Sequence, residues 1–75
     1  MNSNPMDILT KTTHQKCKEY LQTAMQTISR SVLKVAHARK FTISNNPDAD
    51  ELLGLSIASM HEALDNLEHA LEKIK

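Results

Sequence analysis

Apolar residues in the last third of the chain recur at alternating steps of four and three positions. This spacing keeps one apolar stripe on a single helix face, a pattern typical of coiled coils and antiparallel helical bundles. It predicts a helix over about residues 47–75 that packs against another helix. The series consists of Leu53, Ile57, Met60, Leu64, Leu67, Leu71 and Ile74.

A less uniform series with the same spacing predicts an earlier helix over about residues 13–40. Every second member is small, so we expect the large side chains of the later helix to interdigitate with it. We also expect the Cys17 thiol, as a member, to pack like a small buried hydrophobe. The series is Cys17, Leu21, Ala24, Ile28, Ser31, Val35 and Ala38, widened by Tyr20, Met25 and Val32.

Residues 1–12 precede this series and form either an N-terminal arm or the first helical turns. The threonines of this stretch have lower helix propensity than alanine or leucine. The apolar residues between Met6 and Leu9 continue neither series, which makes them a candidate extra contact.

The connection, residues 41–46, is short and ends in asparagine. Asn4-Pro5 and Asn46-Pro47 each fit a helix N-cap followed by a first-turn proline. A short connection between two long helices makes them antiparallel neighbours. We therefore predict one all-α domain over residues 1–75, an antiparallel helical hairpin, with Phe41 and Ile43 covering its turn near Leu52 to Leu55.

A chain of 75 residues with one cysteine has neither an internal disulfide nor zinc-finger spacing to stabilise it. Oligomerisation is the remaining means of stabilising so small a fold. The later helix carries a ridge of small residues beside the apolar stripe, at seven-residue intervals, which would let another helix approach closely. The ridge consists of Ala49, Ser56, Ala63 and Ala70. We therefore predict a four-helix bundle formed by dimerisation. The predicted interface consists of Leu53, Ile57, Met60, Ala63, Leu64, Leu67, Ala70, Leu71 and Ile74.

Charge is divided unequally along a chain of zero formal net charge. Residues 1–44 carry seven Lys or Arg against two acids, and residues 45–75 reverse these counts. Opposite signs would attract within an antiparallel hairpin. A candidate basic patch on the earlier helix could instead contact phosphates, although the neutral net charge, the acidic later helix and the scarcity of aromatic residues count against this. The patch consists of Arg30, Lys34, His37 and Lys40.

One group of side chains resembles a metal ligand set. His61, Asp65 and His69 follow one another at four-residue steps. Asp65 and His69 fall opposite the apolar stripe, where ligands would stay in water, and the zinc-hydrolase motif is lacking. We therefore expect no metal, no cofactor and no catalytic residue. A single glycine, Gly54, also excludes a glycine-rich phosphate loop.

The sequence also indicates where the protein resides and which partners it binds. No apolar run approaches the roughly 20 residues that cross a bilayer, and residues 1–5 lack the features of a signal peptide. The unpaired Cys17 fits a reducing cytoplasm. The leading hypothesis is a non-enzymatic protein–protein interaction module, a homodimer or the partner of another helical protein, acting as a small adaptor, chaperone or regulator. The alternative is a dimeric nucleic-acid-binding regulator that uses the basic patch.

Overall fold

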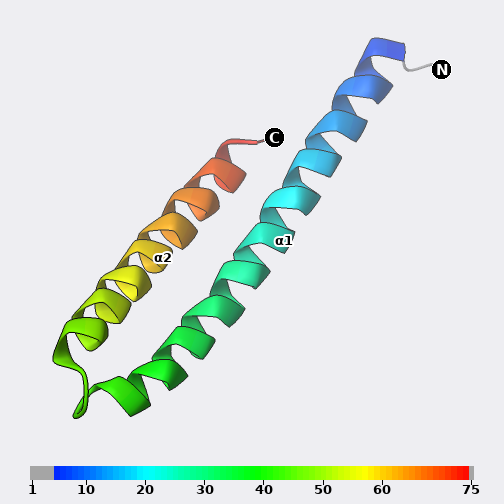
Figure 1. Cartoon of the computed structure of the whole chain (residues 1–75). Coiled ribbons are helices and arrows are strands. Elements are labelled where there is room, and N and C mark those ends of the chain that lie inside the picture. The colour runs from blue at the N-terminus through cyan, green and yellow to red at the C-terminus, as the bar shows by residue number, and fades with distance from the viewer. Residues whose placement is uncertain (1–4, 75) are drawn as a thin grey trace.

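The protein folds into two long helices joined by a short turn (Figure 1). The computed structural model describes the backbone of residues 5–74 and the side chains of residues 12–74. Helix α1 spans Pro5–Thr42 and helix α2 spans Pro47–Lys73, and the two run side by side in opposite directions. The predicted all-α helical hairpin is therefore confirmed.

Helix α1 is longer than the expected residues 13–40 and ends at Thr42. It begins at Pro5 and continues through Thr10, Thr12 and Thr13 without a break. Each threonine costs less than about 0.7 kcal/mol relative to alanine, which is too little to interrupt a helix that already propagates on both sides. The first turns of α1 project beyond the end of α2 (Figure 1). The expected Asn4 cap and the side-chain contacts of Met6 to Leu9 lie outside the described residues.

The turn is held by a cap on α2 and by backbone hydrogen bonds that close α1. The side chain of Asn46 accepts a hydrogen bond of 3.1 Å from the backbone N–H of Ala49, and Pro47 follows in the first turn. The Asn46 N–H donates to the Thr42 carbonyl at 2.8 Å, and the Ile43 N–H donates to the Arg39 carbonyl at 2.9 Å. These bonds leave only residues 43–46 between the helices, so α2 must turn back along α1.

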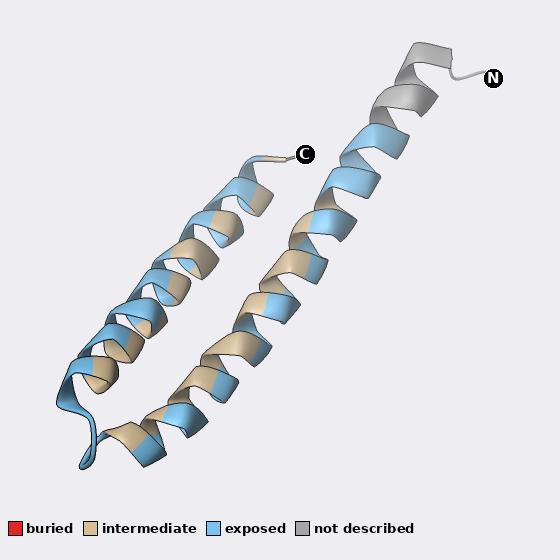
Figure 2. Ribbon diagram, viewed as in Figure 1, coloured by how far each residue is buried: buried red, intermediate tan, exposed pale blue. Residues whose placement is uncertain are grey.

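The apolar stripe of α2 faces α1. Its seven members from Leu53 to Ile74 are all half-buried, whereas Leu52 and Leu55, which lie off the stripe, are 64% and 59% exposed. Figure 2 shows the half-buried residues as a stripe along each helix. The four-three spacing therefore marks the residues through which the two helices pack together, and we refer to this packed stripe as the seam of the hairpin.

The seam of α1 differs from the predicted series at its first and last members. Cys17 and Ala38 are exposed, as is Tyr20, so the expectation of a buried thiol is wrong. The helix is rotated so that the larger Met25 and Val32 also reach α2, which removes more apolar surface from water than the small residues alone would. The half-buried positions are Lys18, Leu21, Ala24, Met25, Ile28, Ser31, Val32, Val35, Ala36, Arg39 and Thr42.

The hairpin has no enclosed core. No residue between Thr12 and Ile74 is buried, and the molecule extends over 67 × 16 × 11 Å. Its radius of gyration is 18.6 Å, against about 11 Å for a compact domain of this length. Phe41 and Ile43 are 77% and 66% exposed, so the predicted apolar cover over the turn is absent from the described residues.

Candidate interaction surfaces

An ion pair at the turn fixes how the two helices are aligned. The Arg39 Nε atom donates to Asp50 Oδ1 at 2.9 Å, and Arg39 Nη2 donates to Asp50 Oδ2 at 3.0 Å. Arg39 lies seven residues after Val32 and Asp50 lies seven residues before Ile57, so each continues the apolar series of its own helix. The ion pair therefore occupies one more rung of the apolar seam.

The hydrogen bonds of this pair change the acidity of both groups. The Arg39 guanidinium lowers the pKa of Asp50, mainly through its hydrogen bonds, and a further bond of 3.3 Å from the Thr42 hydroxyl acts in the same direction. The same hydrogen bonds raise the pKa of Arg39. A bidentate pair of this kind is directional as well as attractive, so it fixes the alignment of the turn.

Sequence reasoning did not single out this pair, although a signal for it exists. Asp50 lies three residues before Leu53 and so continues the heptad series of α2, while Arg39 lies seven residues after Val32 and continues the seam of α1. A charged residue of opposite sign at the matching end of each series is the pattern that would have predicted the contact.

One side of the hairpin is lined by small residues, and we refer to it as the small-residue side. Each of its members comes one position before a seam residue. In antiparallel right-handed helices, stepping back one residue on each helix turns both side chains toward the same side of the pair. The members from α1 are Cys17, Ala24, Ser31 and Ala38, and those from α2 are Ala49, Ser56, Ala63 and Ala70.

Each helix contributes four small residues to this side, at seven-residue intervals. Ala24 and Ala63 are half-buried, while Ala38 and Ala70 at the two ends are exposed. The alanine ridge predicted on α2 is therefore matched by an equivalent ridge on α1, and none of the eight residues is an acid, a lysine or an arginine.

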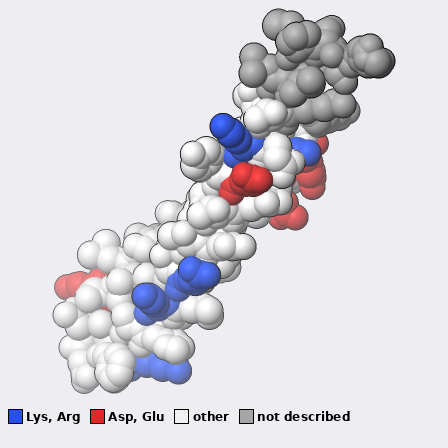
Figure 3. All heavy atoms as spheres, turned by 90° about the vertical axis from the view of Figure 1, so that its right-hand side faces the viewer, with Lys and Arg blue, Asp and Glu red and all other residues white. Residues whose placement is uncertain are grey.

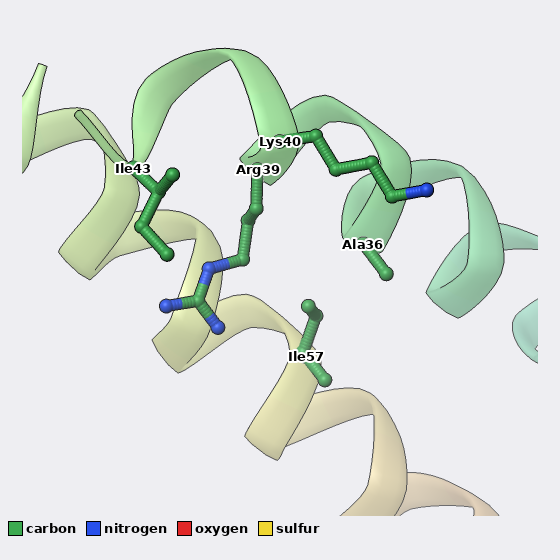
Figure 4. Close-up of a pocket in the computed structure, with 5 residues that line it drawn as sticks. All are labelled: Ala36, Arg39, Lys40, Ile43 and Ile57. Atoms are coloured by element: carbon green, nitrogen blue, oxygen red, sulfur yellow. The ribbon is translucent and has the colours of Figure 1, made fainter. Parts of the chain in front are cut away.

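The opposite side of the hairpin carries a groove of about 450 Å³ near the turn. Ala36, Ile43 and Ile57 supply its apolar walls, and Arg39 and Lys40 supply the remaining lining (Figure 4). Gly54 leaves space for the Arg39 guanidinium, because a Cβ atom at this position would lie 3.4 Å from its carbon and nitrogen atoms. The groove thus combines an apolar surface with the Lys40 ammonium and with the Arg39 guanidinium, which is paired with Asp50.

The candidate basic patch lies on exposed parts of α1. Arg30, Lys34, His37 and Lys40 are all exposed, and Figure 3 shows basic side chains gathered on the face formed by this helix, with acidic side chains farther along it. Within residues 12–74 the one ion pair is Arg39–Asp50, so the expected attraction between the two charged halves is realised in a single contact. The patch is therefore not neutralised by a neighbouring carboxylate of the described chain.

The structure does not assemble a metal site from the candidate ligands. His61, Asp65 and His69 are all exposed on α2. Among the side chains that the structure describes, no three His, Cys, Asp or Glu residues are arranged to hold a metal ion. The three residues remain a series along one open helix face.

Comparisons with known proteins return no match to a family model, to a curated protein or to a solved structure. Over the described residues, neither helix combines the length and the apolar character needed to cross a bilayer.

Proposed function

We propose that this protein is a non-enzymatic helical protein–protein interaction module that acts as a small adaptor, chaperone or regulator. The observation that carries the proposal is the absence of any buried residue between positions 12 and 74, in a chain that is otherwise two regular helices. A second copy or another helical protein completes the fold by covering the open hairpin, as in a four-helix bundle.

The large exposed surface of the chain supports the proposal that another subunit covers part of it. The hairpin exposes 6003 Å², whereas a compact monomer of 8.4 kDa exposes about 4,600 Å². Six large apolar side chains also remain more than half exposed: Tyr20, Leu33, Phe41, Ile43, Leu52 and Leu55. Covering this surface removes apolar area from water, which is the main favourable term in most protein association.

The free thiol supports the proposed compartment. Cys17 is exposed and is the only cysteine of the chain, so it would be open to oxidation outside a reducing environment. We place the protein in the cytoplasm on this ground.

Thermal unfolding at several protein concentrations tests the proposal. Because a subunit that binds only the folded chain raises its melting temperature, a self-associating module should melt at higher temperature as concentration increases. If the partner is another protein, the isolated chain should melt broadly and the bound chain sharply. A sharp transition that is independent of concentration, from a chain that stays monomeric, would overturn the proposal.

A nucleic-acid-binding regulator is the second candidate, and the unneutralised basic patch is the observation that favours it. Binding to duplex RNA or DNA should then weaken steeply with added salt and be lost in Arg30→Glu and Lys34→Glu. Lys73→Glu, at the far end of α2, is the matched control and should bind as the unchanged protein does. Binding that is equally reduced by all three substitutions would argue against a defined patch.

A further inference from the structure

We propose that hairpins associate side by side, with the outer face of α1 in one copy lying against the outer face of α2 in the next. The outer face of a helix is the side directed away from the seam. The inference rests on the proposed function and adds a second contact to it, distinct from the one that completes the fold.

The outer face of α1 near the turn carries positive charge and two large apolar side chains. Between residues 30 and 41 all positions opposite the seam are exposed, no acid occurs, and Figure 3 looks onto this face. Leu33 and Phe41 are 63% and 77% exposed. A partner that fits this face must supply carboxylates together with an apolar contact. The six positions are Arg30, Leu33, Lys34, His37, Lys40 and Phe41.

The outer face of α2 near the turn has the complementary composition. Its positions opposite the seam between residues 48 and 62 are all exposed, and none is Lys or Arg. Leu55, at the middle of this segment, is 59% exposed. Charges of opposite sign, with an exposed leucine on each face, make the two surfaces of this one chain complementary. The positions are Asp48, Glu51, Leu55, Ala58, Ser59 and Glu62.

The two leucines lie at similar distances from the turn. Arg39 and Asp50 are each three residues from the helix end at the turn, and their bond of 2.9 Å shows that both helix ends start at about the same level. At about 1.5 Å per residue, Leu33 lies about 14 Å along α1 from that end, and Leu55 lies about 12 Å along α2. In a copy displaced sideways without rotation, the two leucines therefore meet.

The same displacement brings opposite charges together on both sides of the leucines. Lys40 and Asp48 lie about 3 Å and 2 Å from the helix ends at the turn. Arg30 and Glu62 lie about 18 Å and 23 Å from them, a difference that these long side chains can span. None of these four residues forms an ion pair within residues 12–74, so their charges are available to a neighbouring copy.

The contact joins two different faces, so it does not close after two copies. A two-fold axis between the outer faces would instead set the basic patch against itself, where like charges repel. Contacts between different faces extend from copy to copy, so the assembly grows as concentration increases. Because exposed ion pairs are individually weak, we expect this growth at about 1 mM and not at micromolar concentration.

Charge reversal tests the contact between Arg30 and Glu62. Sedimentation equilibrium of the unchanged protein should give a larger average mass at about 1 mM than at about 10 µM. Arg30→Glu and Glu62→Arg should each keep the micromolar mass at both concentrations. The double variant Arg30→Glu/Glu62→Arg should regain the rise in mass, because it restores opposite charges at the contact.

Arg30→Glu/Glu68→Arg is the matched control. It has the same net charge as the first double variant, but Glu68 lies beside the seam, between Leu64 and Leu71, and not on the outer face. Regained association in this control, or a mass that does not rise with concentration, overturns the inference. A basic patch that serves nucleic acid alone would give the second result. The micromolar mass tests the proposed function separately, so either can fail alone.

Disulfide cross-linking tests which faces meet. Leu33→Cys and Leu55→Cys, each combined with Cys17→Ser, place a single thiol on one outer face or the other. Mild oxidation of an equal mixture should link the two variants to each other, because a disulfide requires Cα atoms within about 7 Å. Each variant oxidised alone should stay unlinked. Equal linking of the Leu33→Cys variant to itself would show that like faces meet and would overturn the inference.

Discussion

Leu64→Ala is the substitution that most directly probes the hairpin seam. Leu64 is half-buried on α2, midway along the apolar stripe. The change removes three carbons from the seam, leaves a good helix former in their place and alters no charge. Its effect should therefore report packing between the helices and little else.

The expected magnitude follows from the burial of the side chain. Leucine-to-alanine changes at buried sites cost about 2 to 5 kcal/mol, and a half-buried side chain in an open seam should lose about half of this, or about 1 to 2 kcal/mol. In a domain of this size, 1 kcal/mol lowers the melting temperature by about 4 to 8 °C. We therefore expect a decrease of about 5 to 15 °C.

Circular dichroism melts at a fixed protein concentration measure this effect, and Leu55→Ala is its matched control. Leu55 lies on the same helix but is 59% exposed, so its truncation should change stability by less than about 0.5 kcal/mol. Equal losses in the two variants would refute the assignment of the seam, because the two sites differ mainly in the helix face that they occupy.

Three further predictions concern the turn and its ion pair. Because hydrogen bonds from Arg39 lower the pKa of folded Asp50, the stabilisation from this carboxylate is fully present above the unfolded pKa of about 4 and is lost as pH falls through the folded pKa. The difference in melting temperature between the unchanged protein and Asp50→Asn should therefore shrink at low pH, and a difference that stays constant down to pH 2 would contradict this. Asn46→Ala should cost about 1 kcal/mol in urea titrations while Asn46→Asp retains the cap, so equal losses in both would show that the side-chain bond to Ala49 is unimportant. Gly54→Ala should stabilise the hairpin by about 0.5 to 1 kcal/mol, since the new Cβ meets only the movable Arg39 side chain, and a lower melting temperature would mean that the ion pair has been displaced.

The sequence predicted α2 more accurately than α1. The series of α2 contains only large apolar residues, so its four-three spacing allows one interpretation, and all seven members lie in the seam. In α1, Ala24 and Met25 are adjacent, as are Ser31 and Val32, so two overlapping series fit the pattern equally well. Both residues of each pair are half-buried, so the seam of α1 is wider than either series alone.

The small-residue side shows why surfaces are harder to predict than helices. Its α1 members were assigned to the seam from spacing, and its α2 members were recognised as a separate ridge. Their relationship depends on the alignment of the two helices, which the Arg39–Asp50 ion pair sets. Periodicity within one helix carries no information on that alignment, so the side became visible only once both helices were in place.

The central claim, that this hairpin is completed by another subunit, is tested most directly by the mass of the purified protein at micromolar concentration. Sedimentation equilibrium should give twice 8.4 kDa, with a melting temperature that rises as concentration increases. A well-folded particle of 8.4 kDa with a concentration-independent melt would contradict the account.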